Sequence, residues 1–267
     1  AMPLLWVIPL GIYLLSFTLA FAENRRPARI VSALAWVAIL TAGRFAMVAR
    51  GSQGLIPVIA SVLLLFFVCT ALHARMYDLR PEPDRLTLFY LTMSAGGAMG
   101  GLFTALVAPV VFDWVWEHPL LVLAAAALLP RDVLPDWRRL KGLEPDMAKL
   151  LVGILVALAA ALLWQLHDAN QYVETEHLRW YYGLALALIG LALVQWRRVT
   201  MPLLLGLMLG QGGLETIQNS RDHIRTRSYF GINTVREYPE QRLRTLAHGT
   251  TLHGEQYTDP ALRRLPI

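Results

Sequence analysis

Two histidines near the end of this chain have the side chains needed to bind a metal ion. The stretch "LAHGTTLHGEQ" (residues 246–256) holds His248 and His253, and His223 precedes them. Neutral imidazoles are good ligands for zinc or copper, so these three histidines are candidate metal ligands. Residues five apart point to opposite faces of a regular β-strand. His248 and His253 can therefore share one ion only if a turn or a bulge lies between them.

The same stretch also has a structural interpretation, which we favour over the metal site. A glycine follows each histidine and permits tight backbone geometry, while the two threonines can bridge backbone groups. This pattern indicates a hairpin that serves as a docking surface rather than as a catalytic loop. The residues of this docking hairpin are Tyr229, Phe230, Gly249, Thr250, Thr251 and Gly254.

Three other features that could do chemistry have simpler explanations. The acidic loops 113–119 and 167–177 could together bind a cation, but a solvated acidic surface is the commoner explanation. Arg44 lies near the end of an apolar run, so we expect its guanidinium to reach the membrane interface. The glycines at 210–213 follow an apolar helix rather than a strand, so they do not predict a dinucleotide-binding loop.

The composition of the chain identifies its broad class. Of 267 residues, 56% are hydrophobic and 16% are charged, against roughly a quarter charged in soluble domains. Long apolar runs with this composition predict a multi-pass membrane protein. The net charge is +5, and the clustering of arginines in loops between apolar runs indicates membrane topology rather than nucleic-acid binding.

The apolar runs predict an all-α polytopic membrane bundle of seven or eight transmembrane helices over residues 1–217. The tail, residues 218–267, holds two short runs of β-branched and aromatic residues separated by 237–241, which predicts a small β-hairpin extension. Seven spans are expected at 3–22, 30–48, 55–73, 86–112, 120–129, 148–166 and 180–196, with a weaker eighth at 199–217.

The charge of the loops predicts the orientation of these helices. Basic segments at 23–29, 74–85 and 130–149 hold most of the arginines and lysines that precede the tail, so the positive-inside rule places them in the cytoplasm and the N-terminus outside. The side of the C-terminal tail depends on the eighth run. The length of that run favours a span and a tail outside, which we adopt, whereas the arginines of the tail favour the cytoplasm.

Glycines in the fourth apolar run favour helix–helix packing. Gly96 with Gly100, and Gly97 with Gly101, are four residues apart, so each pair lies on one helical face. Small residues on a membrane helix let another helix approach closely. We expect this face to be used inside the bundle, with packing against a partner subunit as the alternative.

Three segments of the chain together resemble one protein family. They are "MPLLWVIPLGIYLLSFTLAF" (2–21), "PDRLTLFYLTMSAGGAMGGLFTALVAPVVFD" (83–113) and "RSYFGINTVRE…LAHGTTLHGEQ" (227–256). In this order they resemble the bacterial multi-pass spermidine-synthase-like membrane proteins, in which a polytopic domain is fused to an aminopropyltransferase-like domain. The resemblance implies that the third segment is a β-hairpin subdomain that covers a polyamine pocket. Family members have further helices before the first segment and a Rossmann-like catalytic domain after the third, and we expect both to be missing here.

The resemblance implies a function without catalysis of the chain's own. The family's cofactor loop, its ribose-binding acid and its catalytic aspartate follow the hairpin, so none maps onto this sequence and no cofactor is expected. We expect an anchor or accessory subunit of a larger complex in a bacterial inner membrane. Its partners would be membrane lipids and other membrane-protein subunits, with no nucleic acid.

Two other functions remain as alternatives. The chain could be the membrane part of a polyamine aminopropyltransferase-like enzyme whose cofactor domain is a missing segment or a separate chain. It could also be a small-molecule transporter. The apolar runs offer no evident buried carboxylate to pair with Arg44, and this argues against proton-coupled transport.

Overall fold

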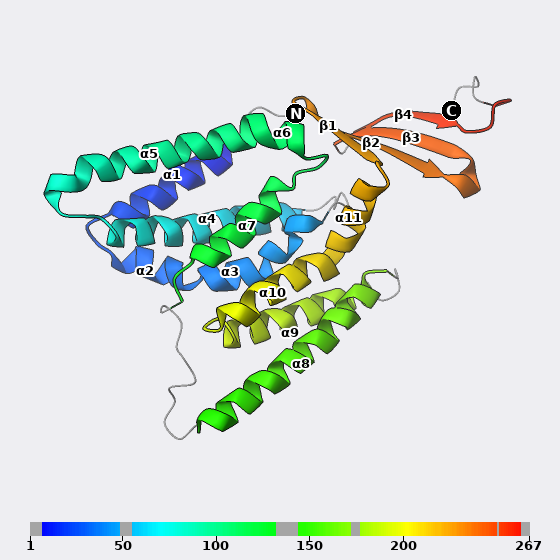
Figure 1. The fold of residues 1–267 in the computed structure, drawn as a ribbon. Coiled ribbons are helices and arrows are strands. Elements are labelled where there is room, and N and C mark those ends of the chain that lie inside the picture. Colours follow the sequence, from blue (N-terminus) through cyan, green and yellow to red (C-terminus); the bar gives the residue numbers. More distant parts are fainter. Residues whose placement is uncertain (1–6, 49–54, 132–143, 172–176, 250, 263–267) are drawn as a thin grey trace. The chain divides into compact units, whose positions relative to one another are not determined.

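The computed structural model describes residues 7–48, 55–131, 144–171, 177–249 and 251–262. The fold is mostly helical (72%) and ends in a small antiparallel sheet (Figure 1), which confirms the helical fold predicted from the sequence. Two units are distinguished by their internal contacts: Ala1–Leu86 with Pro119–Gly213, and Thr87–His118 with Leu214–Ile267. Each unit therefore combines segments that are far apart in the sequence. The domain boundary expected after residue 217 stays a prediction.

The first unit is helical, and its core lies around α3. Trp36, Ile39 and Leu40 of α3 are fully buried, together with Leu186 of α9 and Leu204 of α10. The indole N–H of Trp36 donates to a backbone carbonyl, that of Pro130, at 2.8 Å, so its polar atom is satisfied inside the core. The helices of this unit are α1 (Val7–Phe21), α2 (Arg26–Ala33), α3 (Ala35–Thr41), α4 (Leu55–Asp78), most of α7 (Glu117–Leu128), α8 (Pro145–Ala169), α9 (Leu178–Ala192) and α10 (Arg197–Met208).

The second unit contains a four-stranded sheet in place of the single hairpin expected in the tail, so that expectation is wrong in detail. The strands pair antiparallel in the order β1-β2-β3-β4 (Figure 1). Each predicted strand folds back on itself at a glycine with positive φ, Gly231 in one and Gly249 in the other, so two runs make four strands. The elements of this unit are α5 (Leu86–Leu102), α6 (Ala108–Val111), α11 (Leu214–Arg221), β1 (Arg225–Ser228), β2 (Gly231–Tyr238), β3 (Leu243–His248) and β4 (Thr251–Tyr257).

Three helices in the described part of the chain are long and apolar enough to cross a membrane: Val58–Asp78, Pro83–Val111 and Pro145–Ala169. The prediction of seven or eight spans is therefore wrong in number. A spanning helix needs about 20 residues. The apolar helices α7 and α9 have 12 and 15 residues, so the runs expected to span at 120–129 and 180–196 are too short as helices.

Two of the expected spans are interrupted by local backbone features. The run at 30–48 is divided into α2, α3 and a 3-10 turn at Gly43–Met47. The run at 199–217 passes from α10 through a π-helical turn into α11. Pro202 removes one backbone donor inside α10, and Gly212 has a φ of 138°, which no regular helix contains.

Arg44 is buried among side chains of the first unit, and its expected position at the membrane interface stays a prediction. The residue is 5% exposed and lies in the 3-10 turn after α3, which directs its side chain inward. Its guanidinium lies 4.6 Å from the ring centroid of Phe45 and 5.3 Å from that of Trp180, and such aromatic faces stabilise a cation. Gly183 leaves the necessary space, because a Cβ atom there would overlap the guanidinium.

The glycine face of α5 meets no other side chain among the described residues of its own unit. No residue of α5 is buried, and a Cβ atom added at Gly96, Gly97, Gly100 or Gly101 would meet no atom within 4 Å. Packing of this face inside the bundle, which we expected, stays a prediction. Packing against a partner subunit, the alternative, stays a prediction.

Candidate functional site

The C-terminal sheet and the segment that anchors it form the candidate functional site. The stretch "LAHGTTLHGEQ" makes a complete hairpin within this sheet rather than one strand of a larger hairpin. β3 ends at His248, Gly249 turns the chain with a φ of 59°, and β4 begins at Thr251. Thr250, the remaining member of the predicted docking hairpin at this turn, lies outside the described residues.

The hairpin turn brings the two histidines of this stretch to one face of the sheet. His248 pairs with Thr251 across the turn, and His253 lies two residues beyond Thr251 in β4, so both side chains belong to the same face. A β-bulge follows, because the register of β3 and β4 shifts between Leu246 and Ala247 and leaves His253 as the extra residue of β4. Their ring centroids lie 5.7 Å apart, with the edge of one ring toward the other. The turn and the bulge named as conditions for a shared site are both present.

The histidines do not form a recognisable metal centre with a third ligand. Across the described residues, no group of three or more His, Cys, Asp or Glu side chains is placed to hold an ion. His223 follows α11 with a φ of 52° and is not grouped with the other two. Nε2 of His248 lies 3.1 Å from the carbonyl oxygen of Phe230, and because a carbonyl only accepts, Nε2 carries the proton. A metal at these histidines stays a prediction.

The two hairpin turns lie at the same end of the sheet. The backbone N–H of Gly249 donates to the carbonyl of Ile232 at 2.9 Å, and His248 reaches the carbonyl of Phe230 in the other turn. Tyr229 and Phe230, which form the tip of that other turn, are 65% and 92% exposed. Large aromatic side chains on a well-ordered turn are typical of surfaces that bind another molecule.

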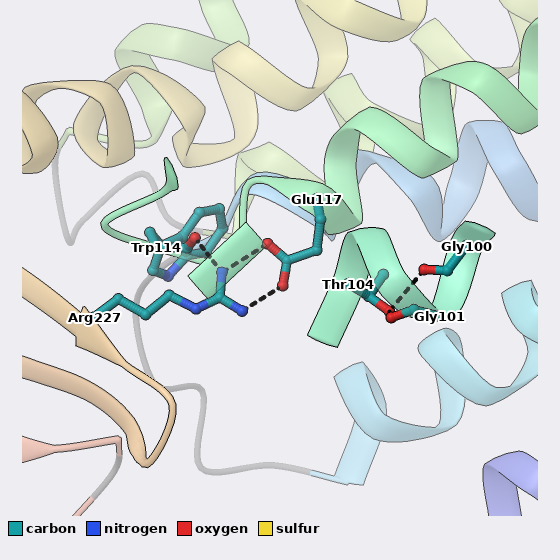
Figure 2. A network of polar contacts seen from close by, with 6 residues as sticks. All are labelled: Gly100, Gly101, Thr104, Trp114, Glu117 and Arg227. Atoms are coloured by element: carbon teal, nitrogen blue, oxygen red, sulfur yellow. Dashed lines mark hydrogen bonds and ion pairs between the residues drawn. The ribbon is translucent and has the colours of Figure 1, made fainter. Parts of the chain in front are cut away.

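An ion pair fastens β1 to the segment that leads into α7 (Figure 2). Both terminal nitrogens of Arg227 donate to the carboxylate of Glu117 at 2.7 Å, and Nη1 also donates to the carbonyl of Trp114 at 2.8 Å. The two charged side chains are only 11% and 13% exposed. This bidentate geometry is the strongest form of a guanidinium–carboxylate contact, and it fixes the orientation of the strand.

Arg225 makes a second attachment from the same strand. Alternate residues of a strand share a face, so Arg225 and Arg227 lie on the same side of β1. Nη2 of Arg225 donates to the carbonyl of Thr216 in α11 at 3.1 Å, and its guanidinium lies 5.4 Å from the ring centroid of Trp114. The sheet is therefore held to its own unit at two points along one strand.

The buried charges of this anchor shift the pKa of each group. Burial opposes ionisation of Glu117, but the hydrogen bond and the charge of Arg227 outweigh that effect and hold the pKa of Glu117 below its ordinary value. The hydrogen bond to Glu117 raises the pKa of Arg227 despite its burial. Burial lowers the pKa of Arg225, against the attraction of Asp113. All these shifts follow from charges that are close together and shielded from water.

Sequence reasoning missed the anchor because its partners are distant in the chain. Glu117 was one of the acids considered for a cation site, but the structure pairs it with Arg227, and Asp113 accepts a hydrogen bond from Trp116 at 2.9 Å. Part of the second acidic loop, 172–176, lies outside the described residues. The one signal was a pair of arginines two apart in a predicted strand, and such a pair is also common on a strand face that meets water.

The site as a whole is a surface that suits binding. It combines two exposed aromatic side chains, two imidazoles in contact, and a strand fixed by buried charges. No family model, curated protein or solved structure matches this chain. The function is therefore inferred from the geometry of this surface and of the exposed membrane helices.

Proposed function

We propose that this chain is an integral membrane anchor or accessory subunit that docks to a larger membrane complex and has no catalysis of its own. We also propose that it is related to the spermidine-synthase-like membrane proteins. The observation that carries the docking role is the exposed aromatic turn Tyr229–Phe230, on a sheet whose first strand is fixed by the Arg227–Glu117 ion pair. A preorganised aromatic surface binds a partner with little loss of conformational freedom.

The membrane helices support the same role. The helix Pro83–Val111 is apolar, and 6% of its most apolar window is buried within the chain. A helix that is apolar on every side and is not covered by its own chain needs lipid or another protein around it. The partners in this proposal are therefore membrane lipids and other membrane-protein subunits.

A complex isolated in mild detergent tests the docking role. The wild-type chain should elute with its partner subunits at a fixed stoichiometry. Changing Tyr229→Ser together with Phe230→Ser should weaken the association at least about thirtyfold, because losing even one hot-spot aromatic costs about 2 kcal/mol of binding free energy. The unfolding midpoint of the chain alone should not change, because both side chains are exposed.

A matched control is available at the opposite end of β2. Tyr238 is 40% exposed and ends that strand, so Tyr238→Ser should leave the association unchanged. An equal loss in both variants would contradict the proposed docking surface. A wild-type chain that elutes alone at the mass of one copy would contradict the accessory role. Aminopropyl transfer by the purified chain would favour the enzyme alternative.

A further inference from the structure

The first unit contains a cavity that is lined by five arginines. It lies between the start of α2, the last turns of α4 and α7, and the start of α10, and has a volume of about 560 Å³. This volume is within the range of pockets that hold small ligands, roughly 300–1,000 Å³. The charged residues that line the cavity are Arg25, Arg29, Arg75, Arg131, Arg197 and Asp78.

The charges around this cavity do not balance. Asp78 is the one carboxylate among the described lining residues, and it pairs with Arg25 at 3.1 Å. The remaining guanidinium groups face a common space without a carboxylate for each. Burial lowers the pKa of Arg131, and the charges of Arg197 and Arg75 lower it further, as expected when cations crowd together.

Several donors of the arginines that line the cavity are buried and have no acceptor among the described residues. Nη1 of Arg25 and both Nε and Nη2 of Arg131 are shielded from solvent and make no hydrogen bond to a residue that the structure describes. Other donors nearby are satisfied: Nη2 of Arg25 bonds Asp78, and Arg75 donates to the carbonyl of Leu128. Buried donors without acceptors are costly, so a bound group that supplies oxygen atoms would stabilise the unit.

A solvated basic rim is the simpler alternative, and it accounts for part of the cluster. Arg29, Arg75 and Arg197 are exposed, as arginines at the cytoplasmic ends of membrane helices often are. It does not account for Arg131, whose guanidinium lies 5.3 Å from the ring centroid of the fully buried Trp36. Nor does it account for the shielded donors of Arg25.

We propose that this cavity binds a phosphate group, carried either by the headgroup of an anionic lipid or by a free phosphate compound. The planar guanidinium offers paired donors that match phosphate oxygens. The cavity borders the ends of apolar helices, and basic pockets between membrane helices bind lipid headgroups. The proposal is independent of the docking role, because it uses none of the residues of the sheet.

Binding to the purified full chain tests this proposal. The probes are phosphatidylglycerol, phosphatidylcholine and inorganic pyrophosphate, each titrated into chain held in a zwitterionic detergent while the unfolding midpoint is followed. We expect saturable stabilisation by a phosphate-bearing anion. Changing Arg131→Gln together with Arg197→Gln should weaken binding about tenfold or more, because two guanidinium forks are lost.

The matched control removes the same charge from neighbouring positions. Arg26 and Arg198 adjoin lining residues but do not line the cavity, so Arg26→Gln with Arg198→Gln should leave the affinity within about twofold. Stabilisation by phosphatidylglycerol alone identifies a lipid headgroup, and stabilisation by pyrophosphate as well identifies the phosphate group itself. Equal weakening in the two double variants, or no saturable binding of either anion, would overturn the proposal.

A second measurement does not depend on the variants folding. Native mass spectrometry of the wild-type chain, released from micelles with equal amounts of the two lipids, should show one phosphatidylglycerol or phosphate retained in preference to phosphatidylcholine. Equal retention of the two lipids, with no phosphate retained, would overturn the proposal even if a variant failed to fold.

Discussion

Arg227 and Glu117 make a pair whose energetics depend on burial. When the pair is intact, each charge has two strong hydrogen bonds, but removing one partner leaves the other charge poorly solvated. Glu117 is also the first residue of α7, where a negative charge is favoured by the helix dipole. The exposed pair of Arg244 with Glu237, about half accessible on both sides, lacks these features.

Changing Glu117→Gln should lower the free energy of unfolding by about 2 kcal/mol, because the buried guanidinium of Arg227 loses its counter-charge. Tryptophan fluorescence during chemical unfolding in detergent measures the effect, since Trp114 lies next to the pair. The matched change Glu237→Gln removes a charge from an exposed pair and should cost less than about 1 kcal/mol. Equal effects of the two changes would show that the buried pair does not stabilise the sheet.

The same substitution should alter the dependence of stability on pH. A carboxyl with a lowered pKa in the folded protein stabilises it above the pKa of the unfolded chain, about 4.3 for Glu. This stabilisation is lost as the pH falls through the lower, folded pKa of Glu117. The unfolding midpoint of the wild type should therefore fall more steeply below about pH 4.3 than that of the Glu117→Gln variant. Parallel profiles would rule out Glu117 as the titrating group.

At the residue scale, the sequence identified positions but not their partners. The spacing of His248 and His253 showed that a turn or bulge had to intervene, and the structure contains both. The sequence could not show that Arg227 pairs with Glu117, because the two residues are 110 positions apart and come together only in the tertiary structure. Nor could it show that Arg44 turns inward, because helix ends and 3-10 turns look alike in an apolar run.

At the scale of elements, the junction between α10 and α11 depends on one backbone conformation. Gly212 has a φ of 138° and a ψ of 0°, a region that side chains with a Cβ rarely enter. The space around it is adequate, since an added Cβ would lie 3.8 Å from Asn170 and from Val48. Any cost of a substitution at Gly212 would thus arise from the backbone alone.

Changing Gly212→Ala should destabilise the chain by about 1–3 kcal/mol, seen as a lower unfolding midpoint. Gly97→Ala is the control, because Gly97 lies inside α5 with no atom within 4 Å of its added Cβ. That change should be neutral or stabilise by up to about 1 kcal/mol through helix propensity. An unchanged midpoint in the Gly212→Ala variant would mean that the kink is not required for folding.

Hydropathy located the apolar elements well but overestimated how many of them span. Runs such as 148–166 correspond closely to a single helix, α8, because nothing in them interrupts the backbone hydrogen bonds. The prediction of a span at 30–48 was wrong, because this run forms three short elements, with Trp36 and Ile39 buried and a turn that begins at Gly43. Hydropathy alone cannot distinguish an apolar segment buried in protein from one surrounded by lipid.

At the scale of the whole molecule, the positive-inside rule predicts how α4 and α8 are oriented across the membrane. Both belong to the first unit and are among the three helices that can span. The basic segment 74–85 covers the end of α4 and the residues after it, and the basic segment 130–149 precedes and enters α8. The positive-inside rule therefore predicts that the C-terminal end of α4 and the N-terminal end of α8 both face the cytoplasm, so that the two helices cross in opposite directions. Because Pro83–Val111 lies between them and can span, this arrangement requires either that Pro83–Val111 does not cross or that the chain crosses again between residues 112 and 144.

Single cysteines and a membrane-impermeant maleimide test this orientation in intact cells. With the native Cys69 changed to alanine, Glu82→Cys places a thiol just after α4, and Gln171→Cys places one just after α8. Both positions are exposed, so accessibility depends on the side of the membrane. Because basic segments stay in the cytoplasm, the thiol at 171 should be labelled in intact cells and the thiol at 82 only after permeabilisation. The reverse pattern would mean the opposite orientation, and labelling of both thiols in intact cells would contradict the cytoplasmic placement of the segment 74–85.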